Sequence, residues 1–255
     1  MIADFLSLFF PYTCHICDKT IAKGILCSRC APKKVEQALW PRCTVCFCHL
    51  EAPDLSTSGR CFVCDANPPP FGQCRYIFEY SEGLRHTLRY TKYHPSYLMA
   101  KELCCRGLEV ARDVGFLEQL LGYDLITVIP PSLKGFWRRD FHLPALLAHT
   151  LWTALNKKRR PQLLHTLKHD WYITPQASLR VSKRILNMKE RWSVCKNVSG
   201  KKVLLLDDVI TTGSSVISAA KSLVASRAAS VDILALTRSP VFEKVRERVL
   251  IACSK

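Results

Sequence analysis

The sequence has no apolar run approaching the roughly 20 residues that a membrane-spanning helix needs. Its apolar start, MIADFLSLFFPYTC, lacks the basic residues that open a signal peptide and leads directly into cysteines, so we expect a packing helix there. With 48% hydrophobic and 23% charged residues, the composition is that of a soluble globular protein. A chain of 255 residues has room for one main domain and an appendage.

Acidic residues are scarce: 21 Asp and Glu stand against 37 Lys and Arg, for a formal net charge of +16. The imbalance is concentrated in residues 131–202, where sixteen basic residues meet three acidic ones, a surplus of +13. Such a region favours an anionic partner, whether a nucleotide, a nucleic acid or a phosphorylated small molecule. A basic surface that only keeps the protein soluble has the same composition, so charge alone does not decide.

Internal repeats and low-complexity segments are absent, apart from a doubled cysteine pattern near the N-terminus. Residues 1–72 are rich in cysteine and turn formers and end in NPPPFG. This Pro- and Gly-rich stretch predicts a boundary. We therefore expect a cysteine-rich zinc-binding module over 1–72 and a second domain over 73–255.

The second region shows the signals of an α/β fold. A strand is expected at CRYIFEY, then a helix capped by Ser81 with Leu84 and Leu88 on one face, and a second helix from about 95 to 113. From residue 123, apolar runs without alternation (DLITVIP, KVLLLDD, VDILALT) are separated by helical stretches. Runs of this kind are typical of strands covered on both faces. The pattern predicts a parallel sheet whose ligands bind at the carboxyl edge of its strands.

Eight of the fourteen cysteines form four CxxC pairs, and no export signal accompanies them, which favours metal binding in a reducing cytoplasm. Each pair places two thiolates on one turn, and two turns complete a tetrahedral zinc site without an open position, so the role is structural. The expected ligands are Cys14, Cys17, Cys27, Cys30, Cys43, Cys46, Cys61 and Cys64.

Two groupings of the four pairs are possible. Sequential grouping joins the first pair to the second and the third to the fourth, whereas a cross-braced arrangement joins the first to the third; short loops favour the sequential one. Cys48 and His49 lie beside the third pair and His15 lies inside the first; all three are interpreted as bystanders, because four thiolates suffice. Buried apolar positions are expected for the other cysteines: Cys74, Cys104, Cys105, Cys195 and Cys253.

The stretch KKVLLLDDVITTGSSV, residues 201–216, carries the most specific signal. We expect a buried strand over 203–206, with Asp207 and Asp208 at its end, where adjacent carboxylates can accept hydrogen bonds from both hydroxyls of a ribose diol. The next turn sets small hydroxyl residues at a helix N-terminus, a cradle for phosphate, with Gly213 supplying backbone freedom. A ribose 5-phosphate site is predicted, although a simple strand-to-helix turn with capping residues has similar elements. The turn comprises Thr211, Thr212, Gly213, Ser214 and Ser215.

This stretch resembles the signature of type I phosphoribosyltransferases, in which apolar residues precede two acidic residues and a T-[TS]-G-[ST]-[ST] turn. The resemblance implies that Asp207 and Asp208 contact the ribose hydroxyls of phosphoribosyl pyrophosphate and that Thr211 to Ser215 hold its 5-phosphate. Mg²⁺ fits such a substrate, because it favours phosphate oxygens and waters. In a transferase, pyrophosphate is displaced at C1 of the sugar; no residue of this sequence is identified as a base for the acceptor.

Cysteine pairs ahead of such a domain resemble the ComF (GntX) family of competence-associated proteins over nearly the whole chain. The matching segments are LFFPYTCHIC, RYTKY at 89–93, TVIPPSLKGFWRRDFHLPALLA at 127–148, and the spaced set Pro175, Gln176, Leu179, Arg184 and Asn187. Asp140 and His142 replace the Gly and Asn of the family's RGFN block, and SRAAS stands where the family has Ala-Gly-Ala.

Basic residues near the expected site are candidates for binding pyrophosphate. The loop after the strand at 125–129 is expected to face the pyrophosphate, as a first strand-end loop does in this fold, and it contains Lys134, Arg138 and Arg139. Lys92 and Arg184 are further candidates. Solvated surface residues are an equally good interpretation of each one.

Two functions from different classes remain open. One is a protein, enzyme or near-enzyme, that binds phosphoribosyl pyrophosphate; a sensor using the same site without turnover is a variant of it. The other is a cytoplasmic single-stranded-DNA-binding factor, since the resemblance implies a link to natural transformation and to DNA-translocation proteins. The basic region and its aromatic residues favour stacking on bases, although aromatics are also typical core residues. These aromatics are Trp137, Phe141, Trp152, Trp171 and Trp192.

Overall fold

The computed structural model describes residues 12–35, 41–50, 58–94, 96–131, 141–169 and 192–240, and the statements below concern these residues. The elements that form the sheet and its covering helices follow one another along the chain. They are β1 (Cys74–Phe78), α3 (Glu82–Tyr93), α4 (Tyr97–Asp113), α5 (Phe116–Gln119), η2 (Leu120–Gly122), β2 (Leu125–Val128), α7 (Leu143–Thr153), β3 (Gln162–Leu163), β6 (Lys202–Ile210), α9 (Ser214–Ala225) and β7 (Ser230–Arg238).

The central sheet has five strands in the order β1-β7-β6-β2-β3, and every neighbouring pair is parallel. A separate antiparallel pair joins β4 (Leu167–His169) to β5 (Trp192–Val194). The predicted α/β fold with a parallel sheet is therefore confirmed. All five strands of the main sheet point their carboxyl ends to one edge, which is where ligands of open α/β sheets bind.

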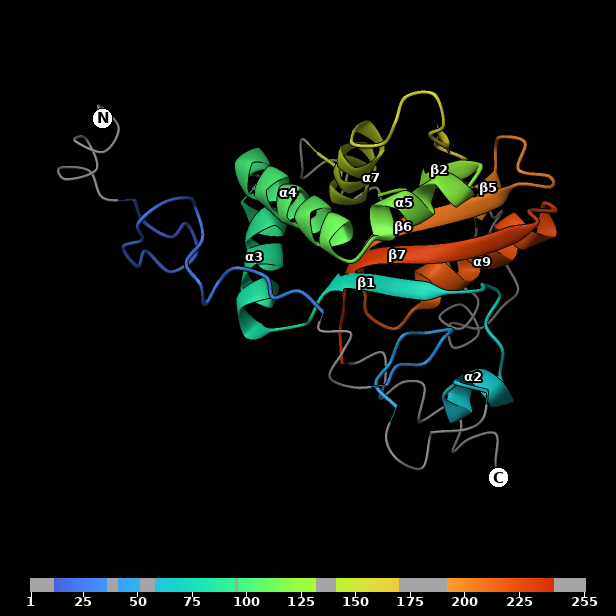
Figure 1. Cartoon of the computed structure of the whole chain (residues 1–255), viewed down its shortest axis with the longest axis horizontal. Coiled ribbons are helices and arrows are strands. Elements are labelled where there is room, and N and C mark those ends of the chain that lie inside the picture. Colours follow the sequence, from blue (N-terminus) through green and yellow to red (C-terminus); the bar gives the residue numbers. More distant parts are fainter. Residues whose placement is uncertain are drawn as a thin grey trace, which may run out of the picture.

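Alternation along the strands divides the core into two layers. Leu204 and Leu206 of β6 pack with α4 and α7, whereas Val203 and Leu205 pack with α9. Figure 1 shows α4, α5 and α7 on one side of the sheet and α9 on the other. Because both faces are covered, the strands are apolar at nearly every position, which is the pattern seen in the sequence.

Serine side chains cap the N-termini of α3 and α4, close to the positions expected from the sequence. The Ser81 side chain accepts a hydrogen bond from the Leu84 amide at 3.1 Å, so α3 begins at Glu82 as predicted. The next helix is α4, which begins at Tyr97 because Ser96 caps it through the Met99 amide. None of the helices in the described part of the chain combines the length and the apolar character needed to cross a bilayer.

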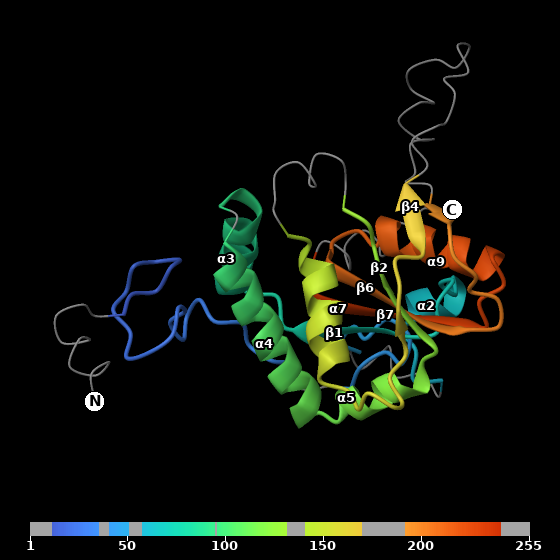
Figure 2. The same ribbon diagram turned by 90° about the horizontal axis from the view of Figure 1, so that it is seen from above.

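The cysteines form two clusters in different places. The first cluster lies beside α3 and α4, and Figures 1 and 2 show its blue segment standing away from the sheet. The second cluster, with the short helix α2 (Phe62–Ala66), lies against β1 and shares one apolar core with β6, β7 and α9. The boundary expected at residue 72 stays a prediction. Apolar residues of the second cluster and of the sheet form one core that extends across this position.

Candidate functional site

The acidic pair lies inside a strand and not after its end. Strand β6 runs to Ile210, four residues beyond the predicted end at Leu206, because β7 continues to pair with it as far as Arg238. On its other side, the last β2 residue paired with β6 is Val128, opposite Leu206. Asp207 and Asp208 therefore project past the end of β2, at the carboxyl edge of the sheet.

The two carboxylates lie next to each other on β6. The alternation that divides residues 203–206 between the two layers does not continue past them, because Val209 packs with the α4 and α7 layer and Ile210 with the α9 layer. Each carboxylate accepts a hydrogen bond at 2.8 Å from the amide of the next residue, Asp208 or Val209. These bonds fix both side chains close to the backbone, and both side chains are partly exposed.

The turn after β6 forms a small hollow at the start of α9. Gly213 has φ 77° and is the N-cap of the helix, a left-handed conformation that favours glycine. Thr212 and Ser214 are exposed, and their hydroxyls lie 3.0 Å apart. The hollow has about 180 Å³ of empty space and is lined by Asp207, Val209 to Ser215 and Val216.

The structure thus brings one predicted carboxylate, Asp207, together with the whole predicted turn, Thr211 to Ser215. Asp208 is next to this hollow in sequence but is not among the described residues that line it. Lys92 lies in the last turn of α3. The other basic candidates lie outside the described residues: Lys134, Arg138, Arg139 and Arg184.

The first cysteine cluster has the geometry of a four-thiolate site. The sulfur atoms of Cys14, Cys17, Cys27 and Cys30 all lie within 4.8 Å of one another, which is the sequential grouping. Zinc–sulfur bonds of about 2.3 Å give a tetrahedron with edges of about 3.8 Å, and the Cys17 and Cys27 sulfurs are 3.7 Å apart. These residues fit a zinc ion.

The second cluster has the same spacing but a different membership. Its sulfurs within 4.8 Å of one another belong to Cys43, Cys46, Cys48 and Cys61, and those of Cys46 and Cys61 are 3.7 Å apart. Cys64 is fully buried and lies in the same apolar core as Cys43, Cys46 and Cys61. The sequence interpretation of Cys48 as a bystander missed this approach, because Cys48 lies outside the CxxC spacing.

Hydrogen bonds to sulfur favour the thiolate form of some members of each cluster, whereas burial raises the pKa of Cys30 to about 12. The backbone amide of Cys30 lowers the pKa of Cys27 to about 6. In the second cluster, the thiols of Cys46, Cys48, Cys61 and Cys64 hydrogen-bond to Cys43 and lower its pKa. The amides of Cys46 and Cys61 also donate to the Cys43 sulfur, at 3.5 and 3.2 Å.

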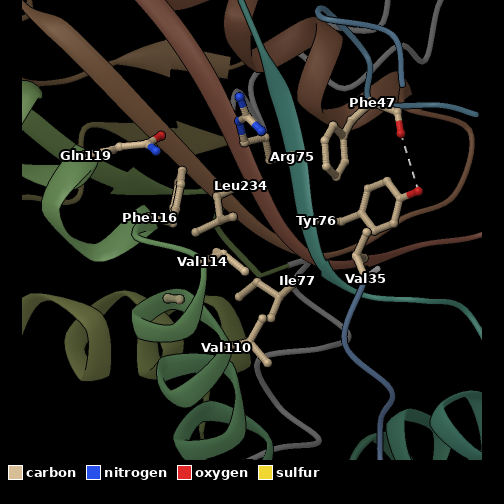
Figure 3. Close-up of a pocket in the computed structure, with 11 residues that line it drawn as sticks. Val35, Phe47, Arg75, Tyr76, Ile77, Val110, Val114, Phe116, Gln119 and Leu234 are labelled. Atoms are coloured by element: carbon tan, nitrogen blue, oxygen red, sulfur yellow. Dashed lines mark hydrogen bonds between the residues drawn. The ribbon is translucent and has the colours of Figure 1, made fainter. Parts of the chain in front are cut away.

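A buried arginine ties the second cluster to the sheet. The Arg42 side chain is 5% exposed, and its guanidinium donates to Glu79 and to the Tyr76 hydroxyl, each at 2.6 Å. Figure 3 shows Phe47 and Tyr76 facing each other beside β1, with the Tyr76 hydroxyl donating to the Phe47 carbonyl.

From the end of β7, the Arg238 guanidinium donates to the Cys46 carbonyl at 2.7 Å. The carboxyl edge of the sheet is thus joined to the cysteine cluster. Neither Arg42 nor Arg238 stood out in the sequence, because their partners are distant along the chain.

Two expectations about other residues are corrected. Cys74 and Cys104 are buried as expected, but Cys105 and Cys195 are exposed; Cys253 lies outside the described residues. Trp192 is only 5% exposed and lies against the ring of His169, so it is a core residue and not a stacking surface.

A groove between α4 and α7 carries basic and aromatic side chains. Its empty volume is about 740 Å³, its lining includes Tyr97, Lys101, Arg112 and His149, and none of the described residues lining it is acidic. Beyond the end of α7, the Arg160 guanidinium lies 3.4 Å from the centroid of the Trp152 ring.

Hypoxanthine phosphoribosyltransferases are among the solved structures that resemble this chain. Hypoxanthine phosphoribosyltransferase from Trypanosoma cruzi is 16% identical and aligns over 56% of this chain and 64% of its own, with a TM-score of 0.31. The Staphylococcus aureus enzyme is 14% identical over 55% and 64%, with a TM-score of 0.32.

Among characterised sequences, the chain is similar to proteins named for DNA utilization and competence. DNA utilization protein YhgH is 27% identical in Escherichia coli K12 and 29% identical in Salmonella typhimurium, in both over 91% of this chain and 99% of the relative. Competence protein F of Haemophilus influenzae is 28% identical over 84% and 92%. These relatives confirm the resemblance to the ComF family, although no family model matches the chain.

Proposed function

We propose that this protein is a ComF-like factor of DNA uptake that binds phosphoribosyl pyrophosphate at the β6–α9 junction. The observation that carries the proposal is the hollow in which Asp207 meets the hydroxyl-rich turn 211–215 at the carboxyl edge of a parallel sheet. A carboxylate can accept hydrogen bonds from ribose hydroxyls, and the neighbouring turn can bind a phosphate. One ribose 5-phosphate carries both of these groups.

Each part of the junction has a proposed role. The exposed hydroxyls and amides of Thr211 to Ser215 bind the 5-phosphate, helped by the positive end of the α9 dipole. Asp207 and Asp208 accept hydrogen bonds from the ribose hydroxyls. Because Asp207 lines the hollow and Asp208 is not among the described residues that do, we expect Asp207 to make the contact nearest the phosphate.

The pyrophosphate end needs positive charge. Mg²⁺, bound through phosphate oxygens and waters, and some of Lys92, Lys134, Arg138, Arg139 and Arg184 are proposed to supply it. Strand β2 ends at the same carboxyl edge where Asp207 lies, and Lys134, Arg138 and Arg139 follow this strand in the sequence. If phosphoribose is transferred, a bound acceptor attacks C1 and pyrophosphate leaves.

The two cysteine clusters are proposed to hold structural zinc, one ion each. Their sulfur distances suit a tetrahedral site, and four thiolates leave no position for a substrate. Reduced thiols in such number suit a cytoplasmic location. The names of the relatives, DNA utilization protein and competence protein F, support a role with the proteins that import DNA.

Calorimetric titration with phosphoribosyl pyrophosphate and Mg²⁺ tests the main proposal. We expect saturable binding by the zinc-loaded protein and a loss of about 100-fold or more in Asp207→Ala/Asp208→Ala, since each hydrogen bond to a charged group contributes about 1.5–3 kcal/mol. Asp113→Ala/Asp65→Ala removes two exposed carboxylates elsewhere and serves as the control. Unchanged affinity in the Asp207/Asp208 variant contradicts the proposal.

The second candidate function is binding of single-stranded DNA. The α4–α7 groove favours it, because Lys101 and Arg112 face no acidic residue there. The planar guanidinium of Arg160 stacked on Trp152 is a surface of the kind on which bases stack. A strand along this groove and a sugar phosphate at the sheet edge occupy different surfaces, so the two functions are compatible.

Fluorescence anisotropy with a labelled oligothymidine at increasing salt tests this candidate. We expect binding that weakens steeply with salt, and a slope of log affinity against log salt that is smaller by about two in Lys101→Glu/Arg112→Glu. Lys196→Glu/Lys221→Glu changes the charge equally at exposed positions elsewhere and should matter less. No binding even at low salt contradicts the DNA function.

A further inference from the structure

The second cysteine cluster contains one thiol more than a tetrahedral metal site can use. Five cysteines converge there: Cys43, Cys46, Cys48, Cys61 and Cys64. The Cys48 sulfur lies within 4.8 Å of those of Cys43, Cys46 and Cys61, and Cys64 is buried in the same core and interacts with the same three thiols. The two side chains are thus alternative fourth members of one set of three.

The first cluster provides an internal reference. Its leading hairpin matches that of the second: the Cys14 amide donates to the Lys19 carbonyl at 2.8 Å, as the Cys43 amide donates to the Cys48 carbonyl at 2.9 Å. Lys19 therefore occupies the position of Cys48, and its side chain is exposed. The first cluster therefore contains four thiols, whereas the second contains five.

We propose that Cys48 and Cys64 share the fourth zinc position of the second cluster, and that either one completes the site with Cys43, Cys46 and Cys61. This rests on the zinc-binding part of the proposed function. Exchange between the two arrangements is balanced: a zinc–sulfur bond to Cys48 forms as the bond to Cys64 breaks, and the thiol proton moves from Cys48 to Cys64. Zinc keeps four thiolates throughout.

The two arrangements differ in what they expose. Cys64 is 0% exposed, whereas Cys48 is only partly buried. When Cys64 binds zinc, the spare thiol is therefore the one that solvent and reagents can reach. The site keeps its metal while presenting a thiol at its rim, a property that the first cluster lacks.

Zinc content of purified variants tests the proposal. The wild type should hold two zinc ions per chain, and Cys48→Ser and Cys64→Ser should each still hold two. Cys48→Ser/Cys64→Ser should hold one. Cys30→Ser, at the corresponding last position of the first cluster, should also fall to one, because no fifth thiol replaces it. Cys105→Ser, at an exposed cysteine outside both clusters, should keep two.

Other outcomes overturn the proposal in distinguishable ways. If Cys64→Ser alone loses a zinc ion, Cys48 is no ligand; if Cys48→Ser alone loses one, Cys48 is a fixed ligand and there is no sharing. If the double variant keeps two, neither thiol is needed. A wild type with fewer than two zinc ions overturns the zinc proposal itself.

Cobalt spectra provide a readout that does not depend on the double variant folding. In Co²⁺-loaded Cys48→Ser and Cys64→Ser, the sulfur-to-cobalt absorption should keep the intensity of two four-thiolate sites. A drop to the intensity expected for seven thiolates in either variant means that serine or water has replaced a thiol, which contradicts sharing. Cys30→Ser should show that drop or lose the site.

Discussion

The two cysteine clusters begin with the same hairpin and meet different surroundings. In each, a bridge closes the hairpin, Thr13 with Thr20 and Arg42 with His49, and the residue after the second cysteine has positive φ. The first cluster packs mainly on Met99 and neighbouring helix residues, whereas the second shares the core of the sheet. Similar arrangements of cysteines therefore stabilise an appendage in the first cluster and the main core in the second.

The largest expected difference concerns loss of one zinc ligand. Cys43→Ser should lower the melting temperature of the zinc-loaded protein by about 10 °C, because losing a metal inside the shared core removes several kcal/mol. Cys14→Ser, the corresponding change in the first cluster, should move the main transition by about 2 °C or less. Differential scanning calorimetry measures both; equal shifts contradict the distinction between appendage and core.

A smaller effect is expected at the arginine that joins the second cluster to the sheet. Arg42→Ala should cost about 3 kcal/mol of unfolding free energy in urea, because Glu79 and the Tyr76 hydroxyl lose a buried partner. Arg85 forms an exposed ion pair with Glu82, and Arg85→Ala should change stability by about 0.5 kcal/mol or less. Comparable losses in the two variants would show that the Arg42 contacts do not anchor the cluster.

The smallest effect is expected where the first cluster touches α3. A Cβ at Gly83 would overlap the carbonyl oxygen of Arg29, so Gly83→Ala should shift this cluster away from the helix. We expect amide exchange over residues 27–31 to accelerate about tenfold, because a loosened contact lowers the free energy of local opening by about 1.4 kcal/mol, while the main melting transition stays nearly constant.

Gly122→Ala is the matched control, since a Cβ there meets nothing within 4 Å. Unchanged exchange in Gly83→Ala would mean that the cluster is not held by this contact. A large fall in the temperature of the main melting transition would instead show that the first cluster unfolds together with the core.

The sequence predicted those features whose chemistry is contiguous along the chain. Strand β6, the turn 211–215 and helix α9 follow each other directly, so periodicity and residue type located the junction. The end of β6 was placed too early, because its pairing with β7 decides where the strand stops. The acidic pair looks terminal in sequence although it lies within the strand.

Features that depend on contacts between residues far apart along the chain could not be predicted from the sequence. Cys48 joins the second cluster through the path of the hairpin, and Arg42 is buried because Glu79 and Tyr76 approach it from β1 and the segment after it. Cys105 is exposed because its side of α4 borders the groove with α7. Residue type alone predicts burial for a cysteine and exposure for an arginine.

The most direct test of the sugar-phosphate site is its location by NMR. Phosphoribosyl pyrophosphate with Mg²⁺ is added to the zinc-loaded, isotope-labelled protein, and amide shifts are followed. We predict the largest changes at residues 207–208 and 211–216, with little change in either cysteine cluster. Saturable changes confined to another region, or none at millimolar ligand, would contradict a ribose 5-phosphate site at the β6–α9 junction.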